Sequence, residues 1–431
     1  MSTVLLHSFS FASQIAKHIK QSDFDKNTKV SLYAINKQNS DILYKKNENL
    51  ALNPASTLKP LTFGLSYLIL GANHAFETSL YEDKDNNFYI KLGGDVLLTQ
   101  DELNKLASNL KNKKINNIYI DDTIFDKTPY PQTWQEEDKW PNFNIISPYI
   151  IDNNATKISI KRSSLTSKVD ISQDDDYKIP IIKELKLSDS HCIKIARPYG
   201  ETSPIISLQG TVSKDEEISI PILNPEINFN IKLNQALKKN DVIHLNRIET
   251  KKTPQDATKI ASVGHSINEI SKLILHNSNN FASEVVFKVA ASKYYNKEAG
   301  FDDAVKMFNE HFEKYLSKNE KIADASGVSR QNLLSTKTIL NIFLDIQSKT
   351  DILSLLPTSS EGTLKERLLF LSGNLKAKTG SLRDYSSLLA SIKTRKNTDI
   401  LFVSIVQNST KRKSLLKNYE NTLLGLIYKK Y

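Results

Sequence analysis

The sequence predicts a mixed α/β chain of the α+β kind with more than one domain. At 431 residues the chain is longer than one typical hydrophobic core supports. Strand-like segments fill its middle part, and helical patterns return after that block. Apolar residues make up 39% of the chain and charged residues 25%, which is typical of a sequence that folds.

The first elements expected along the chain are a β-hairpin and a buried helix. Alternating or apolar runs at Val30–Ala34 and Ile42–Tyr44 flank a polar stretch, which favours two strands joined by a turn. Residues Leu61–Ala72 are almost wholly apolar, and a helix that is apolar all round is a buried helix. Asn53 can cap this helix, and Pro54 suits its first position.

The middle block is expected to be rich in strands, with two helical patterns in it. The helical patterns are Asp101–Lys111 and Asn224–Lys239, the second of which has a proline near its start. The strand-like runs are Phe88–Leu92, Ile115–Ile120, Lys157–Lys161, Cys192–Ala196, Ile205–Gln209 and Ile218–Ile222.

The last third of the chain is expected to be helical, with two strands near its end. The helix at Ser414–Tyr431 has one apolar face, which we expect to pack on the sheet. The other helical patterns are Ser266–Leu275, Asn280–Ser292, Asp302–Leu316 and Thr336–Gln347, and the strands are Lys376–Ile392 and Asp399–Val406.

Three short strings in a fixed order indicate chemistry. They are the S-x-x-K string Ser56–Lys59, the S-x-N string Ser278–Asn280 and the K-T-G string Lys378–Gly380. Such strings together form a serine acyl-transfer site that uses lysine as its base. Each string alone is more often an N-cap, a helix boundary or a strand end, and only K-T-G is unique in this chain. Their order therefore carries the signal.

Ser56 is the candidate nucleophile and Lys59 is its candidate base. On a helix, residues three positions apart face the same way. A free lysine has a pKa of about 10.4, so Lys59 must be buried or lie beside a second cation, for which Lys378 is the candidate. Pro60 follows directly and has no N–H, so we expect a 3₁₀ turn or a bend there.

The other two strings supply groups that could handle the substrate. Ser278 can bridge the two lysines and pass a proton to the leaving amine, and Asn280 can hold a substrate carbonyl. Gly380 allows a substrate backbone to lie close to the strand. Together with the lysine of the same string, the hydroxyls of Thr379 and Ser381 suit a terminal carboxylate. The backbone N–H groups of the nucleophile and of the K-T-G strand would form an oxyanion hole.

With these strings in this order, the chain resembles a known family. It is similar to the class C low-molecular-mass penicillin-binding proteins, the D-alanyl-D-alanine carboxypeptidases and endopeptidases of the penicillin-binding protein 4 type. The resemblance covers most of the chain. The stretches that carry it are Pro54–Lys59, Ser278–Glu284, Asp324–Arg330, Glu361–Leu364 and Lys376–Leu382.

The resemblance implies a transpeptidase-like domain, an antiparallel sheet flanked by helices, into which two nested β-rich domains are inserted. The long gap between Ser56 and Ser278 fits this organisation, because compact relatives such as serine β-lactamases have far fewer residues there. The expected boundaries are 1–75 and 245–431 for the catalytic domain, 76–86 and 147–244 for inserted domain II, and 87–146 for inserted domain III.

The resemblance also implies an activity. It implies hydrolysis of D-Ala-D-Ala bonds, or of D-Ala–diaminopimelate cross-links, in peptidoglycan stem peptides through an acyl-serine, with β-lactams as covalent inhibitors. It carries over the nucleophile, the base and the S-x-N and K-T-G residues named above. No cofactor and no metal are expected.

The resemblance implies four further substrate-binding residues. Asp138 and Phe143 match the family's spacing of an aspartate and a phenylalanine that approach the substrate's side-chain amine. Arg330 matches the arginine of the Ser-Gly-x-Ser-Arg string. Arg383 stands where some members have glutamine, and Asp384–Ser386 also departs from the family pattern, so fine specificity is open.

Three other classes of protein are alternatives to this function. A β-lactamase would need a group that places the deacylating water, often in an E-x-x-L-N setting, and no such string lies between the first two motifs. A non-catalytic wall-binding protein would retain the fold without the chemistry. A Ser-His-Asp hydrolase lacks support, because there is no G-x-S-x-G elbow and the eight histidines show no pairing.

Charge and the chain start bear on partners and compartment. The net charge of +10 is spread along the chain, which favours a solvated basic surface over nucleic-acid binding and leaves a peripheral membrane contact open. The single cysteine excludes an intrachain disulfide. Residues Val4–Ala16 are apolar in part but lack a basic stretch before them, so a signal peptide is not evident and is either removed or atypical. A periplasmic location is expected, and the oligomeric state is open.

Overall fold

In the computed structural model the chain forms two compact units. The first comprises Met1–His74 and Ile267–Tyr431, and the second comprises Ala75–Ser266. The predicted apolar patch at Val4–Ala16 lies mostly outside the described residues. The described residues are 13–22, 24–163, 168–173, 175–200, 203–243 and 246–431.

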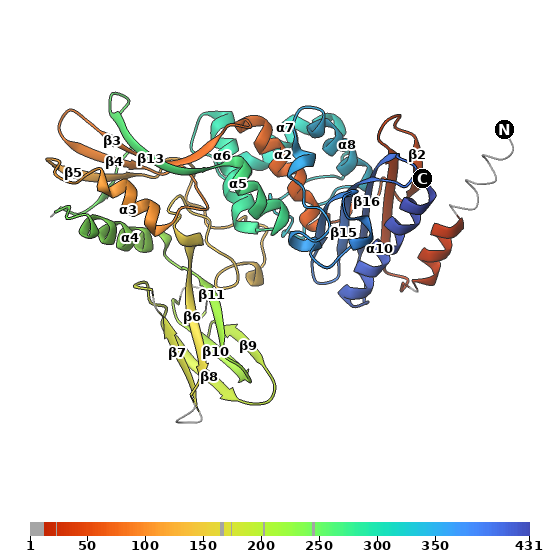
Figure 1. The fold of residues 1–431 in the computed structure, drawn as a ribbon, viewed down its shortest axis with the longest axis horizontal. Coiled ribbons are helices and arrows are strands. Elements are labelled where there is room, and N and C mark those ends of the chain that lie inside the picture. The colour runs from red at the N-terminus through yellow and green to blue at the C-terminus, as the bar shows by residue number, and fades with distance from the viewer. Residues whose placement is uncertain (1–12, 23, 164–167, 174, 201–202, 244–245) are drawn as a thin grey trace. The chain divides into compact units, whose positions relative to one another are not determined.

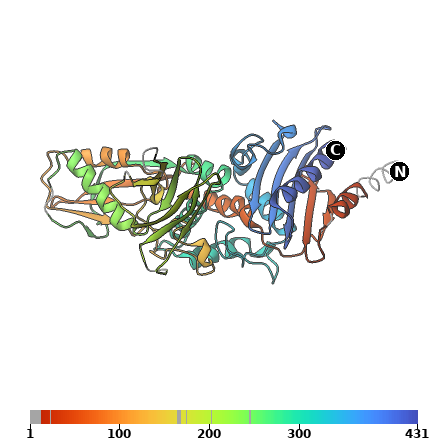
Figure 2. The same ribbon diagram turned by 90° about the horizontal axis from the view of Figure 1, so that it is seen from below.

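The first unit is built on one antiparallel five-stranded sheet in the order β14-β15-β16-β1-β2. Strands from both ends of the chain therefore share one sheet, and Figure 2 shows the red N-terminal strands beside the blue C-terminal ones. The central pairing joins Ser31 to Ile405 and Tyr33 to Val403. The strands are β1 Lys29–Asn36, β2 Ile42–Lys46, β14 Leu375–Ser381, β15 Ser386–Lys393 and β16 Asp399–Gln407.

Helices cover both faces of this sheet. α10 lies on one face, where Leu416 and Leu423 share a buried core with Leu388 and Phe402 of the strands (Figure 1). α8 lies on the other face, where Thr336 hydrogen-bonds the β1 strand. The helices of this unit are η1 Ala55–Leu58, α2 Lys59–Leu70, α5 Ile267–Ser271, η4 Lys272–His276, α6 Asn280–Tyr295, α7 Phe301–Phe312, η5 Glu313–Tyr315, α8 Thr336–Gln347, α9 Ile352–Leu355, η6 Gly362–Leu364, η7 Leu369–Leu371 and α10 Lys413–Lys430.

Two sequence predictions in this unit were wrong in detail. The single strand expected over Lys376–Ile392 is two strands, β14 and β15, which reverse at a turn around residues 382–385. The turn residues 382–385 include neither glycine nor proline, so no local signal marked the reversal. The helix expected at Ser266–Leu275 is a short α-helix that runs into a π-helical turn at Lys272–His276.

The second unit contains three sheets. A five-stranded sheet in the order β12-β5-β4-β3-β13 is covered by α3 and α4, whose Leu103, Leu106, Phe229 and Leu233 share its core. Two three-stranded sheets, β8-β10-β9 and β11-β6-β7, enclose a second core. The elements are β3 Ala75–Glu82, β4 Asn87–Lys91, α3 Gln100–Ser108, β5 Asn117–Asp121, η2 Glu136–Asp138, η3 Asp152–Asn154, β6 Ala155–Arg162, β7 Val169–Gln173, β8 Ile181–Leu187, β9 Cys192–Ala196, β10 Ile206–Val212, β11 Glu216–Pro221, α4 Pro225–Lys239, β12 Glu249–Thr250 and β13 Thr258–Ser266.

The contacts place residues 245–266 in the second unit, whereas the sequence boundaries put them in the catalytic domain. The reason is β13, which was not predicted and which pairs along its length with β3 in antiparallel register. The further division of this unit into two nested domains stays a prediction.

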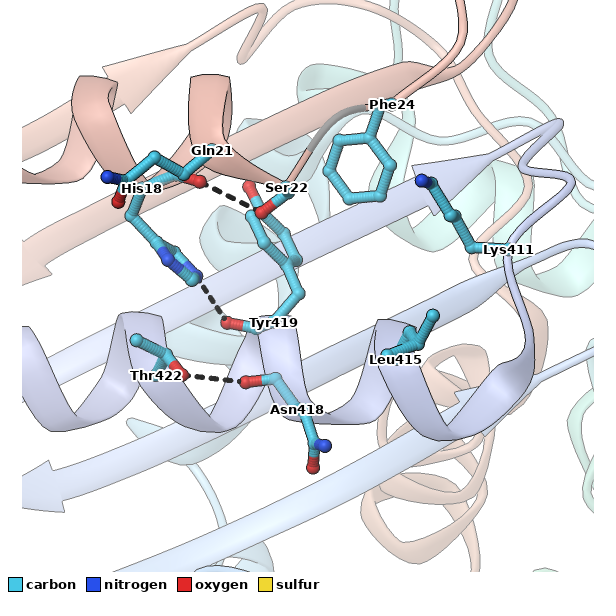
Figure 3. A pocket seen from close by; sticks show the side chains of 9 residues that line it. All are labelled: His18, Gln21, Ser22, Phe24, Lys411, Leu415, Asn418, Tyr419 and Thr422. Carbon is cyan, nitrogen blue, oxygen red and sulfur yellow. Dashed lines mark hydrogen bonds between the residues drawn. The ribbon is translucent and has the colours of Figure 1, made fainter.

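A hollow of ≈ 270 Å³ lies beside α10, next to the helical residues 13–21 (Figure 3). The ring of His18 stacks on that of Tyr419 at 5.2 Å, and its Nε2 lies 3.3 Å from the Tyr419 carbonyl oxygen. None of the residues of the three strings lines this hollow. Among the described residues, no helix is both long and apolar enough to cross a bilayer.

Candidate active site

The turn that carries Ser56 is shaped by Pro60. Ser56 lies in the 3₁₀ turn η1, and α2 begins at Lys59. In a regular α-helix the Ser56 carbonyl would accept from residue 60, which has no N–H. Here the Lys59 N–H donates to that carbonyl instead, in the tighter 3₁₀ pattern. The expected local 3₁₀ turn is therefore present. Ser56 in this turn is partly exposed, whereas the helix that follows is mostly buried.

Backbone strain lies directly before the nucleophile. Ala55 has φ +47°, a conformation that a non-glycine residue rarely adopts. The Asn53 side chain holds it there, because its Oδ1 accepts from the Ala55 N–H at 2.8 Å while its Nδ2 donates to the Ser329 carbonyl at 2.9 Å. Such conformations persist where surrounding contacts over-determine them.

Two glycines enclose this strained turn. A Cβ at Gly327 would lie 2.0 Å from the Ala55 carbonyl oxygen, and a Cβ at Gly380 would lie 2.9 Å from the Ser56 nitrogen. The K-T-G strand therefore passes directly beside the nucleophile, and its glycine makes room for the nucleophile turn, whereas we expected it to make room for a substrate backbone. Ser387 on the neighbouring strand adds a hydrogen bond from its Oγ to the Pro54 carbonyl at 2.6 Å.

We expect Gly327→Ala to destabilise the protein more than Gly373→Ala does. Both glycines have positive φ, but a Cβ at Gly373 would meet nothing within 4 Å. The Gly373 variant should lose about 1–2 kcal/mol from the left-handed backbone alone. The Gly327 variant should lose a further ~1–3 kcal/mol, because the new methyl group overpacks against the nucleophile turn. Urea unfolding gives both free energies, and equal losses would contradict the close approach.

The Lys59 ammonium is completely buried and makes three hydrogen bonds. Its Nζ donates to Ser56 Oγ at 3.0 Å, to Asn280 Oδ1 at 2.8 Å and to the Ser326 carbonyl oxygen at 2.6 Å. These contacts use all three donors of an ammonium group. Burial lowers the pKa of Lys59 to about 7, although the carboxylates of Asp324 and Glu284 oppose the shift.

Lys378 and Ser278 form the second pair. Lys378 is also fully buried, and its Nζ donates to Ser278 Oγ at 2.8 Å and to the Thr379 carbonyl at 2.9 Å. Burial, followed by the charge of Lys59, lowers the pKa of Lys378 well below its usual value. The hydrogen bonds thus pair Ser278 with Lys378 and Asn280 with Lys59, whereas we expected Ser278 to bridge both lysines.

Several residues of this site were not singled out as functional from the sequence. Thr363 Oγ1 lies 2.8 Å from Thr379 Oγ1, which places its hydroxyl beside the K-T-G strand. Ser326 contributes only its backbone carbonyl, and Ser387 acts on backbone too. Thr363 and Ser326 fall within stretches that carry the family resemblance, which was the available signal. No sequence pattern marked Ser387.

The remaining predicted site residues are more dispersed. Arg330 donates to the Val328 carbonyl at 3.1 Å, and Arg383 is exposed in the turn after β14. Asp138 and Phe143 belong to the second unit. Asp138 is 5% exposed and accepts from the Gln135 N–H at 3.2 Å, while the ring of Phe143 packs edge-on against a tryptophan.

Comparison with known proteins gives consistent results. A profile described as the D-Ala-D-Ala carboxypeptidase 3 (S13) family matches residues 11–428. D-alanyl-D-alanine carboxypeptidase DacB of Haemophilus influenzae is 24% identical over 471 residues, covering 98% of this chain and 97% of the relative. A D-alanyl-D-alanine carboxypeptidase of an Actinomadura species is 24% identical over 80% of this chain and 72% of its own length.

Solved structures establish the fold. The crystal structure of penicillin binding protein 4 from Haemophilus influenzae matches with a TM-score of 0.82 at 22% identity, covering 96% of this chain and 99% of that one. A second structure of that protein, in complex with a β-lactam, matches with a TM-score of 0.77 at 20% identity over the same shares. The fold class predicted from the sequence is confirmed.

Proposed function

The chain belongs to the D-Ala-D-Ala carboxypeptidase 3 (S13) family and is thus a serine-type D-Ala-D-Ala peptidase, and we propose that Ser56 is its nucleophile and Lys59 its base. One observation carries this assignment: the buried Lys59 Nζ lies 3.0 Å from Ser56 Oγ. The substrate is a peptidoglycan stem peptide that ends in D-Ala-D-Ala, or a cross-link that contains the corresponding D-Ala bond.

Acylation follows from the contacts of Lys59. When neutral, its amine keeps two N–H donors on Asn280 Oδ1 and the Ser326 carbonyl, and its lone pair faces Ser56 Oγ. The amine takes the hydroxyl proton as Oγ attacks the substrate carbonyl carbon. The Ser56 N–H and the Ser381 N–H stabilise the oxyanion, each contributing about 3–4 kcal/mol.

Collapse of this intermediate breaks the amide bond. Ser278 gives its hydroxyl proton to the leaving nitrogen and takes one from the Lys378 ammonium, so D-alanine departs as an amine and the acyl group stays on Ser56. Water then attacks the acyl carbon and gives a proton back to Lys378 through Ser278, while Lys59 returns its proton to Ser56 Oγ and the ester bond breaks. The hydroxyls of Thr379 and Ser381, with the charge of Lys378, bind the terminal carboxylate, and Asn280 Nδ2 donates to a substrate carbonyl. Gly380 lets the K-T-G strand lie against the nucleophile turn, where a Cβ would come within 2.9 Å of the Ser56 nitrogen, and so brings the strand's backbone to the substrate.

The rate of acylation should rise as pH increases through about 7. A lysine acts as a base only when neutral, and the pKa of Lys59 is about 7, so the unprotonated fraction grows above that pH. The second-order rate constant for labelling by a fluorescent penicillin, measured from pH 5 to 9, checks this. A rate that stays low until pH approaches 10 would contradict a lysine base with a lowered pKa.

Activity assays test the function and separate it from its alternatives. A peptide ending in D-Ala-D-Ala should release D-alanine. Benzylpenicillin should acylate the protein stoichiometrically, and nitrocefin should turn over slowly. Fast nitrocefin turnover would favour a β-lactamase, and no labelling of folded protein would favour a non-catalytic wall-binding role. Activity retained after replacement of all eight histidines would exclude a Ser-His-Asp mechanism.

Four residues are proposed to set the finer specificity. Asp138 and Phe143 contact the side-chain amine of the stem peptide, Arg330 lies near the acyl site, and Arg383 alters how the stem is recognised. The burial of Asp138 supports a fixed carboxylate, which suits recognition of a cation better than a solvated one would.

Asp138→Asn should weaken hydrolysis of diaminopimelate-containing substrates more than hydrolysis of a plain acyl-D-Ala-D-Ala peptide. The change removes the charge that faces the diaminopimelate amine and keeps the side-chain shape. The ratio of kcat/KM for the two substrates measures the effect and cancels any general loss of folded enzyme. An equal loss on both substrates would remove Asp138 from this role.

A peptidoglycan substrate lies outside the cytoplasmic membrane, so the proposed activity places the protein in the periplasm. β-Lactams, which resemble the acyl-D-Ala-D-Ala end, are its covalent inhibitors. Fractionation of cells followed by fluorescent penicillin labelling tests both statements.

A further inference from the structure

A buried glutamate contacts the backbone segment that binds Lys59. Glu284 on α6 is completely buried. Its carboxylate accepts from the Ala325 N–H, 3.1 Å from each oxygen, and from the Ser326 N–H at 2.9 Å. Asn280 of the S-x-N string lies one turn earlier on the same helix, so Glu284 is close to the candidate active site.

The backbone held by Glu284 is the same backbone that holds Lys59. Ser326 gives its N–H to Glu284 and its carbonyl oxygen to Lys59 Nζ, at 2.6 Å. The preceding carbonyl, that of Ala325, accepts from Thr62 Oγ1 at 2.8 Å, which ties the segment to α2. A shift of Glu284 would therefore move an acceptor that orients the Lys59 amine toward Ser56.

The charges around this position make it more than a packing residue. Burial and then the nearby Asp324 carboxylate raise the pKa of Glu284 to about 8, against the hydrogen bonds from residues 325 and 326. The carboxylates of Glu284 and Asp324 raise the pKa of Lys59, opposing its burial. The charged groups that interact with Glu284 are Asp324, in the segment that follows α7, and Lys59 at the start of α2.

We propose that Glu284 is a positioning residue for acylation: it fixes the segment whose Ser326 carbonyl aims the Lys59 amine at Ser56. The proposal rests on the proposed function, since it takes Lys59 as the base for Ser56. Glu284 does not touch the reacting atoms, and its effect reaches them through Ser326.

The test compares the pH profile of acylation in matched variants. Glu284→Gln keeps the shape and turns an amide donor toward backbone N–H groups that now donate to the carboxyl oxygens. Glu320→Gln is the control, because Glu320 is also a buried carboxylate that accepts backbone N–H groups, from Ser317 at 2.8 Å and Ser335 at 2.6 Å. Labelling by a fluorescent penicillin is measured from pH 5 to 9, and thermal melting reports the fold.

Glu284→Gln should lower the plateau rate about tenfold or more, because Lys59 is held less accurately. The acid limb should stay in place, because a pKa of about 8 keeps most Glu284 side chains protonated where Lys59 titrates, so the substitution removes little charge there. Glu320→Gln should lose stability but keep the wild-type profile. A wild-type plateau rate in Glu284→Gln, or an equal fall of the plateau rate in Glu320→Gln, overturns the proposal.

A second variant keeps the proposal testable should Glu284→Gln not fold. Glu284→Asp retains the charge but is one methylene shorter, so it should lower the plateau rate and leave the acid limb in place. A wild-type plateau in Glu284→Asp overturns the anchoring role. Failure of the wild-type protein to label at Ser56 would instead refute the proposed function, so the two failures are distinguishable.

Discussion

Ser56→Ala will abolish both the release of D-alanine and the covalent attachment of penicillin, while the fold stays intact. The variant lacks the only atom that can carry the acyl group, so the expected loss of kcat is about 10⁴-fold or more. Lys59 keeps its contacts to Asn280 and Ser326, which should preserve the local structure. D-alanine release and fluorescent labelling measure the loss, and circular dichroism checks the fold.

The matched control is Ser66→Ala on the same helix. Ser66 is also buried, and its Oγ donates to the Thr62 carbonyl at 2.9 Å, but it lies two turns beyond the site. This variant should retain labelling at the wild-type rate. Full D-alanine release by Ser56→Ala would refute the assignment of the nucleophile, whatever the control shows.

Lys59→Arg is expected to be nearly as damaging, although it keeps the positive charge. A guanidinium has a pKa above 12 and cannot give up its proton near neutral pH, so it cannot accept one from Ser56. The guanidinium is also larger than the ammonium that it replaces, which is fully buried and surrounded by three hydrogen-bond acceptors. The acylation rate constant should fall by about 10³-fold or more, the upper range for loss of a general base.

Lys293→Arg provides the comparison for size and charge. Lys293 belongs to α6 and donates to the Leu70 carbonyl at 3.0 Å, away from the three strings. Its replacement should leave the acylation rate unchanged. Acylation of Lys59→Arg at the wild-type rate would show that the base is elsewhere, with Lys378 as the next candidate.

Much of the fold followed from local sequence patterns. The β1–β2 hairpin, the buried helix α2, the middle strands and helices α4, α6, α8 and α10 lie close to their predicted positions. Strands β3, β7, β8, β12 and β13 were missed. Strands β3 and β13 pair with each other across the inserted block, and such long-range pairing leaves little local signal.

In the candidate site, the reactive side chains were predicted from the sequence and the backbone contacts that support them were not. Strings with a fixed spacing identified Ser56, Lys59, Ser278, Asn280 and Lys378, and the structure brings these five side chains together. The supporting contacts were not predictable, because they act through backbone atoms. Examples are the Ser326 carbonyl on the lysine and the positive φ of the residue before the nucleophile.

The family resemblance could be stated from the sequence because its motifs are contiguous, and the match over residues 11–428 confirms it. Specificity depends instead on side chains from separate parts of the chain. Asp138 and Phe143 were inferred from spacing alone, and their role toward substrate stays a prediction.

Whether Ser56 is the nucleophile is decided by intact-mass analysis after treatment with benzylpenicillin, followed by peptide mapping of the adduct. We expect one penicilloyl group per chain, attached to the peptide that contains Ser56 and absent from Ser56→Ala. An adduct on any other side chain, or none on the folded protein, would contradict this assignment.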